Sequence, residues 1–169
     1  MKLIQEEKFF SNLNLILPEI KKVKLYNQQD FISLRKQKAN WPGLRSFPLN
    51  ESCPILHELI IEIFNKKKIL EKGSYKIASF LHLRLEEDKK KDWIHQDEDE
   101  LAALIYISKT NLDSGTFLFD DKDNLINDIK FVQNRLIIFS GKYRHAGYGH
   151  HGSSIDDGRL TINLFINKV

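Results

Sequence analysis

Five strand-like segments in the second half of the chain constrain its fold most. Each is rich in aliphatic, β-branched or aromatic residues, and polar or glycine-containing stretches separate one from the next. The segments occupy residues 75–86, 100–108, 115–120, 135–140 and 159–166. This pattern predicts a β domain, and the sequence contains neither an internal repeat nor a low-complexity linker that would divide it.

The first half of the chain mixes helix and strand signals. Residues 21–26 alternate like a short strand, and Asp30 is expected to cap a short helix over residues 31–38. A longer helix is predicted over residues 53–70, because Pro54 suits a first helical turn and apolar residues then recur at helical spacing. We expect one face of this helix to pack against the sheet.

Length and composition favour a single domain. A chain of 169 residues, 41% of them hydrophobic, can bury one sizeable core. We expect one domain over residues 1–169, in which residues 1–73 form supporting helices and strands and residues 74–169 form the β core. With 26 Lys and Arg against 23 Asp and Glu, the chain lacks the dense basic field of an obligate nucleic-acid binder.

The sequence also bears on compartment. Cys53 is the single cysteine and cannot form an internal disulfide, and charged residues interrupt the apolar ones at the N-terminus before a signal-peptide core could form. No apolar run approaches the roughly 20 residues that a membrane-spanning helix needs. We therefore expect a cytoplasmic protein with no membrane partner.

Histidine, aspartate and arginine residues recur near the ends of the predicted strands. His95 and Asp97 stand two residues apart in an extended segment, so their side chains share one face. His145 follows the segment 135–140 after a short loop, and antiparallel packing could bring it to the same place. Arg159 opens the last strand, where an inward-facing guanidinium needs an anion. An isolated His-x-Asp pair can simply tie down a loop, but this ordered set indicates a metal site.

Several stretches of the second half carry a family resemblance: WIHQD, LAALIYIS, GTFLF, NRLIIFSGKYRHAG and GRLTINLF. They resemble the Fe(II)- and 2-oxoglutarate-dependent dioxygenases, and among these the prolyl-4-hydroxylase-like subgroup of small bacterial or phage type. The resemblance covers residues 75–168. It implies a single oxygenase domain that is mainly β with flanking helices: a double-stranded β-helix, the cupin-like jelly roll of two facing sheets.

The resemblance implies a metal centre made of His95, Asp97 and His145. Two imidazoles and a carboxylate form the facial triad of non-haem Fe(II) oxygenases and leave positions for a 2-oxo acid and O2. Fe(II) would be the cofactor, with 2-oxoglutarate and O2 as cosubstrates and ascorbate as a further candidate. No catalytic side chain beyond the metal centre is implied. His150 and His151 lie in a glycine- and serine-containing stretch and are the competing candidates for ligands.

Three further residues are implied in binding 2-oxoglutarate. Arg159 matches the basic residue that the family carries on its last strand, and its planar guanidinium suits a carboxylate. Tyr106 and Thr161 would add hydroxyl groups beside it, because one follows the triad on the next strand and the other shares the face of Arg159.

The implied reaction is hydroxylation of a C–H bond, with release of succinate and CO2. A prolyl residue of a peptide or protein is the expected target, and His82, Arg84 and Trp93 are the candidate substrate contacts. The alternatives are a small-molecule hydroxylase, a nucleobase demethylase with the same iron chemistry, or a jelly roll that binds without catalysis. The nearly balanced charge gives no strong nucleic-acid signal.

Overall fold

The computed structural model describes residues 3–88, 92–149 and 151–169, which alternate between helices and strands in the first half and form strands in the second. In chain order the elements are β1 (Ile4–Glu6), α1 (Leu13–Lys22), β2 (Leu25–Tyr26), α2 (Gln28–Arg35), β3 (Leu44–Ser46), α3 (Leu49–Ser52), α4 (Pro54–Lys67), β4 (Tyr75–Arg84), β5 (Leu101–Tyr106), β6 (Asn111–Phe119), β7 (Leu125–Phe131), β8 (Leu136–Ser140), β9 (Arg144–Tyr148) and β10 (Arg159–Lys168).

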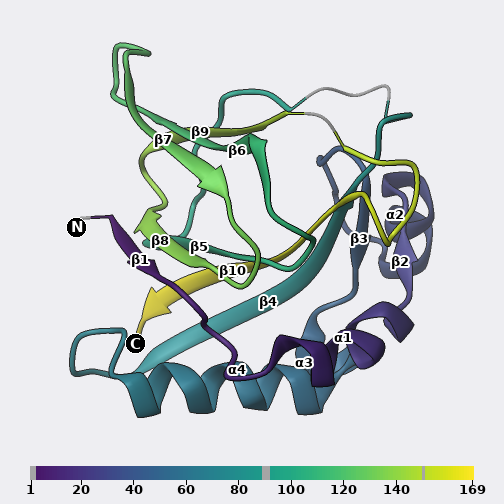
Figure 1. Cartoon of the computed structure of the whole chain (residues 1–169), viewed down its shortest axis with the longest axis horizontal. Coiled ribbons are helices and arrows are strands. Elements are labelled where there is room, and N and C mark those ends of the chain that lie inside the picture. Colours follow the sequence, from purple (N-terminus) through teal and green to yellow (C-terminus); the bar gives the residue numbers. More distant parts are fainter. Residues whose placement is uncertain (1–2, 89–91, 150) are drawn as a thin grey trace.

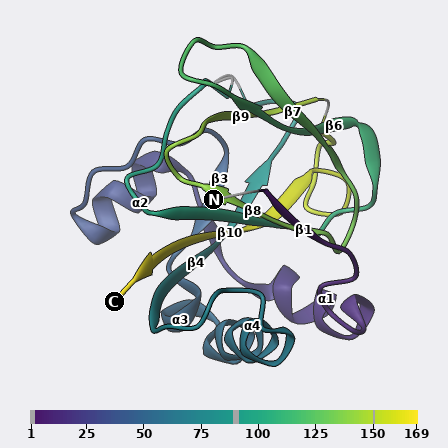
Figure 2. The same ribbon diagram turned by 90° about the vertical axis from the view of Figure 1, so that its left-hand side faces the viewer.

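These elements form three layers, with a large sheet between a helical layer and a small sheet (Figures 1 and 2). The large sheet has seven strands in the order β1-β8-β5-β10-β4-β3-β2, and the small sheet has three in the order β7-β6-β9. All of these pairs are antiparallel. Helices α1, α3 and α4 lie along one face of the large sheet, and the small sheet faces the other.

Strand β10 separates two environments, because successive side chains of a strand point to opposite faces. Leu160, Ile162, Leu164 and Ile166 belong to the apolar core that the large sheet shares with the helices. The alternate residues, beginning with Arg159, face the small sheet. Residues directly opposite each other on paired strands share a face, so Arg84 joins Arg159, while His82 and Tyr106 join Thr161.

The helices agree with the sequence in part. Helix α4 begins at Pro54 as predicted and packs Leu56, Ile60 and Phe64 into the core. The expected cap of the short helix is wrong: Asn27 caps α2, and its side chain accepts a hydrogen bond from the backbone nitrogen of Asp30 at 2.8 Å. None of the described helices is long and apolar enough to cross a membrane.

The sequence pattern did not predict six of the elements, namely β1, α1, β3, α3, β7 and β9. Helix α1 includes Lys21 and Lys22, so the expected strand over residues 21–26 shrinks to Leu25 and Tyr26. Strands β7 and β9 are absent from the predicted set, because β7 carries Asn, Asp and Lys among its apolar residues and β9 carries Arg, His and Gly. Both become strands by pairing with β6. The two facing antiparallel sheets with helices outside confirm the predicted class, mainly β in a jelly roll.

Candidate metal centre

The described residues that precede β5, 92–100, meet β9 at one antiparallel bridge, which places His95 beside His145. The two residues exchange backbone hydrogen bonds, 3.0 Å from the nitrogen of His95 and 2.8 Å from that of His145. Two residues further on, the backbone nitrogen of Asp97 donates to the carbonyl oxygen of Gly141 at 2.9 Å. Two segments that lie far apart in sequence thus form one short ladder, and it fixes the backbones of all three predicted ligands.

The two imidazoles are oriented in the same way. Nδ1 of His95 donates to the carbonyl oxygen of Trp93 at 2.9 Å, and Nδ1 of His145 donates to that of Tyr143, also at 2.9 Å. A proton on Nδ1 leaves the lone pair on Nε2. The Nε2 atoms lie 4.0 Å (His95) and 3.5 Å (His145) from carboxylate oxygens of Asp97. Backbone carbonyls therefore set the tautomer in which Nε2 can bind a metal.

The structure brings together the three residues that the sequence predicts as metal ligands. One ligand atom from each of His95, Asp97 and His145 lies within 4.8 Å of the others. His145 is buried, Asp97 is half-buried and His95 is exposed. His145 follows β8 after a short loop, as the sequence predicts, and it lies within β9, a strand that was not predicted and that forms by pairing with β6.

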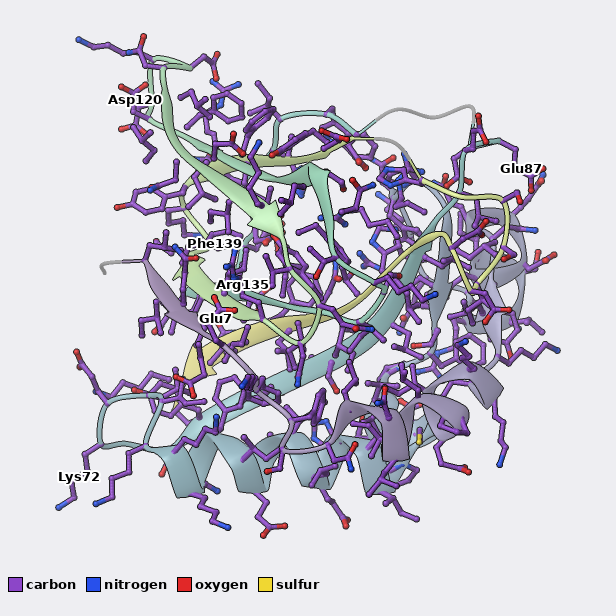
Figure 3. The ribbon with its side chains drawn as sticks, in the orientation of Figure 1. Glu7, Lys72, Glu87, Asp120, Arg135 and Phe139 are labelled. Atoms are coloured by element: carbon purple, nitrogen blue, oxygen red, sulfur yellow. The ribbon has the colours of Figure 1, made fainter. Side chains whose placement is uncertain are left out.

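Burial shapes the chemistry of His145. It lowers the pKa of the imidazole, the neighbouring His95 lowers it further, and Asp97 acts in the opposite direction. The neutral imidazole that a metal requires is therefore favoured at neutral pH. The ring of Phe139 packs edge-on against His145 with centroids 4.9 Å apart. Figure 3 labels Phe139 on β8, where it belongs to the apolar cluster between the two sheets.

Gly141 allows the close approach of the segment that carries Asp97. A Cβ atom at this position would lie 2.2 Å from the carbonyl oxygen of Asp99 and 3.4 Å from Cβ of Asp97. The first distance is shorter than any real contact, so a larger residue would push this segment away. Gly141 also accepts the hydrogen bond from Asp97 described above.

A cavity of about 480 Å³ opens beside the three candidate ligands, between the two sheets. Arg159, Thr116 and Gly147 belong to its lining, as do Phe139 and Asn163. Polar and apolar groups are mixed along it, so the cavity can hold a ligand with charged ends and a hydrocarbon body.

Arg159 is a buried cation within this cavity, and its side chain is held by neutral groups. Nη2 lies 3.3 Å from the carbonyl oxygen of Gly115 and 3.3 Å from Oγ1 of Thr116, and Nε is buried with no acceptor. Within the described part of the chain no carboxylate pairs with it, and burial lowers its pKa. A buried guanidinium without an anion is costly, so this position favours an anionic ligand.

The predicted partners of Arg159 are engaged elsewhere in this structure. The hydroxyl of Tyr106 donates to Oγ1 of Thr116 at 2.8 Å, and that of Thr161 donates to Oδ1 of Asn163 at 2.7 Å. Tyr106 lies on β5 and Thr161 lies on β10 two residues after Arg159, but neither belongs to the lining of the cavity, and their roles toward a cosubstrate stay predictions. The sequence analysis missed Thr116. Its one signal was a lone hydroxyl in the apolar segment GTFLF.

The predicted substrate contacts separate into two groups. His82 and Trp93 line the cavity, while Arg84 is absent from its lining and pairs with Asp88 at 2.9 Å and Asp92 at 3.2 Å. Nε2 of His82 donates to the carbonyl oxygen of Pro42 at 2.6 Å. Burial and three nearby arginines hold the pKa of His82 well below its usual range, so the ring is neutral.

Of the two competing histidines, His151 lies among the described residues. Among the residues that the structure describes, the cluster able to hold a metal consists of His95, Asp97 and His145, and His151 is not part of it. His150 lies outside the described residues.

Comparisons with known proteins identify the fold. No protein-family model and no curated protein matches the chain. Among solved structures, HygX from Streptomyces hygroscopicus with nickel and 2-oxoglutarate bound is 10% identical, with a TM-score of 0.68 over 99% of this chain and 83% of that one. An oxidoreductase of the 2OG-Fe(II) oxygenase family from Burkholderia pseudomallei is 13% identical, with a TM-score of 0.65 over 98% and 84% of the two chains.

A third structure has the same fold over nearly its whole length. The viral collagen prolyl hydroxylase vCPH from Paramecium Bursaria Chlorella virus-1, in complex with 2OG, is 12% identical, with a TM-score of 0.61 over 100% of this chain and 97% of that one. The chain thus has the fold of the 2OG-Fe(II) oxygenases, prolyl hydroxylases included. The double-stranded β-helix implied by the sequence resemblance is confirmed.

Proposed function

We propose that the protein is an Fe(II)- and 2-oxoglutarate-dependent dioxygenase that hydroxylates a C–H bond of its substrate. The observation that carries the proposal is the arrangement of His95, Asp97 and His145, with both Nε2 atoms turned toward one carboxylate beside a cavity. The shared fold supports it, because structures of HygX hold iron, or nickel with 2-oxoglutarate.

The three ligands suit iron in their chemistry and number. Two neutral imidazoles and one carboxylate leave about three positions of an octahedron for other molecules. When bound, Fe(II) would supply the oxidation, in which O2 and 2-oxoglutarate yield succinate, CO2 and a hydroxylated product. The carbonyls of Trp93 and Tyr143 hold the imidazoles in place, so little reorganisation is needed when the metal binds.

Arg159 would hold the distal carboxylate of 2-oxoglutarate. Thr116 and the carbonyl of Gly115 fix its guanidinium without neutralising it. Tyr106 in turn fixes Thr116, and its ring lies against Phe131 with centroids 4.3 Å apart. Arg159 therefore has a set position and an unmet charge, which is what bidentate pairing with a carboxylate requires. Thr161 and Tyr106 would contact the same carboxylate only after changing their present partners.

For the substrate we propose a prolyl residue of a peptide or protein. The sequence resemblance and the fold shared with vCPH, a collagen prolyl hydroxylase, support this choice. Small-molecule hydroxylation is the second candidate, because a structure of the same fold, HygX, was solved with hygromycin B bound. His82 and Trp93 line the cavity in which either substrate would lie.

Anaerobic titration of the metal-free protein with Fe(II) and 2-oxoglutarate tests the proposal. We expect the weak visible charge-transfer band of a chelated 2-oxo acid, and succinate when O2 is admitted. Asp97→Ala should give neither, whereas Glu51→Ala, which removes an exposed carboxylate paired with Arg35, should give both. Absence of the band from the folded wild type would refute the cofactor assignment. Proline peptides assayed for hydroxyproline then test the substrate.

A further inference from the structure

A second arginine, Arg45, lies in the same cavity. It stands on β3 opposite His82 of β4, so both side chains face the cavity side of the sheet. Its guanidinium carbon lies 4.5 Å from the ring centroid of Trp41, 5.6 Å from that of Phe80 and 5.9 Å from that of Phe165. The guanidinium of Arg45 thus lies among three aromatic rings.

The donors of this group have no acceptors. Nε of Arg45 and Nε1 of Trp41 are both buried and make no hydrogen bond. Within the described residues, no oxygen accepts from the terminal nitrogens of Arg45 and no carboxylate pairs with it. Cation-π contacts engage the charge of a guanidinium but satisfy none of its N–H groups. Aromatic packing alone therefore leaves the two buried donors unsatisfied, while the guanidinium of Arg45 borders the cavity, where a partner with lone pairs can reach it.

The charges around Arg45 point to an anion. Burial lowers its pKa to about 10, and Asp97 acts in the opposite direction from across the cavity. Asp92 is already paired with Arg84, and Glu98 is exposed. In the proposed cofactor complex, the charges of Fe(II), 2-oxoglutarate, Asp97 and Arg159 cancel. Arg45 itself forms no ion pair with a described carboxylate of the cavity lining.

We propose that Arg45 and Trp41 bind a carboxylate of the primary substrate, so that the substrate is an acid with an apolar body. The planar guanidinium offers paired donors to a carboxylate, and the indole N–H adds a third. The rings of Trp41 and Phe165 supply the apolar walls. The assignment of this molecule as the hydroxylated substrate rests on the proposed function, but binding of the carboxylate can be measured without turnover.

Two probe pairs test this binding. N-acetyl-L-proline and its amide represent the end of a peptide, and phenylacetate and phenylacetamide represent a free small acid. Affinities are measured by calorimetry on the full chain, metal-free and after anaerobic loading with Fe(II) and 2-oxoglutarate, which occupies Arg159. Arg45→Gln removes the proposed contact. Arg35→Gln is the control, since it removes an equal charge that pairs with Glu51 outside the cavity.

We expect at least one acid to bind about tenfold or more tightly than its amide in wild type and Arg35→Gln, as charge-assisted hydrogen bonds require. The preference should vanish in Arg45→Gln. The pair that shows it identifies the source, a peptide end or a free acid. Equal affinity for acids and amides in wild type, or a preference that persists in Arg45→Gln, would overturn the proposal.

A measurement on the wild type covers the case in which Arg45→Gln fails to fold. The indole N–H resonance of Trp41, assigned by its loss in Trp41→Phe, should shift on addition of the acid and stay in place with the amide. No shift with either acid overturns the proposal. The charge-transfer band separates the two hypotheses. If an acid binds but the band is absent, the dioxygenase assignment alone is refuted. If the band is present but no acid binds, the role of Arg45 alone is refuted.

Discussion

Replacing Arg159 with methionine should have opposite effects on cosubstrate binding and on stability. Arg159 is 7% exposed, pairs with no described carboxylate and keeps one nitrogen without an acceptor. In the metal-free protein its buried charge therefore destabilises the folded state. An apolar side chain of similar length should leave the free energy of unfolding unchanged or raise it by about 1–3 kcal/mol. Urea denaturation of the metal-free protein measures this difference.

The same change should weaken 2-oxoglutarate binding severely. Breaking a buried ion pair by removing one partner costs about 3–5 kcal/mol, which corresponds to roughly 10²- to 4 × 10³-fold in the dissociation constant. Anaerobic titration that follows the charge-transfer band measures the constant, and Arg35→Gln should leave it within about twofold. A loss of affinity below tenfold, or a metal-free Arg159→Met protein less stable than wild type by more than about 1 kcal/mol, would refute the reasoning.

Three further changes test other parts of the site. His145→Ala should abolish Fe(II) binding in an anaerobic titration with the circular dichroism spectrum unchanged, and His57→Ala, which alters a histidine paired with Ser79 outside the cavity, should still bind the metal. Because burial holds the pKa of His82 well below 6.5, its imidazole binds a proton in the unfolded chain at a pH at which it stays neutral in the folded chain. Stability should therefore fall as pH drops below about 6.5, by up to about 1.4 kcal/mol per pH unit, and His82→Gln should flatten this slope in urea denaturation between pH 7 and 5; an unchanged slope would assign the effect to other groups. Gly141→Ala should cost about 1–3 kcal/mol, because its Cβ would strike the carbonyl of Asp99, and should weaken Fe(II) binding; wild-type stability and affinity together would contradict the steric argument.

The candidate ligands could be predicted because their signal is local or ordered. His95 and Asp97 share a face whenever their segment is extended, whatever the rest of the fold does. His145 was found by its order along the chain, although its strand was not, since RHAGY has too few apolar residues to be read as one. Arg159 was found because it opens an otherwise apolar strand.

The residues that were missed depend on pairing between distant segments. Thr116 reaches Arg159 only because β6 and β10 lie on opposite sides of the cavity, in different sheets. Arg45 enters the cavity because β3 joins the edge of β4 with Arg45 opposite His82. The segment NWPGLRS, which contains Trp41 and Arg45, is rich in turn residues, and its pattern fits a packing turn as well as part of a substrate entrance. Such pairings arise from tertiary contacts that no local pattern encodes.

The alternation along β10 makes the position of Arg159 a test of correct folding. A slip of one residue against β4 and β5 would turn Leu160 into the cavity and drive Arg159 into the apolar core beneath the helices. A misregistered chain would thus lose the proposed cosubstrate anchor and bury an unpaired charge at the same time. Retention of 2-oxoglutarate therefore reports native register, and the cosubstrate itself would select the correctly paired sheet from its misfolded competitors.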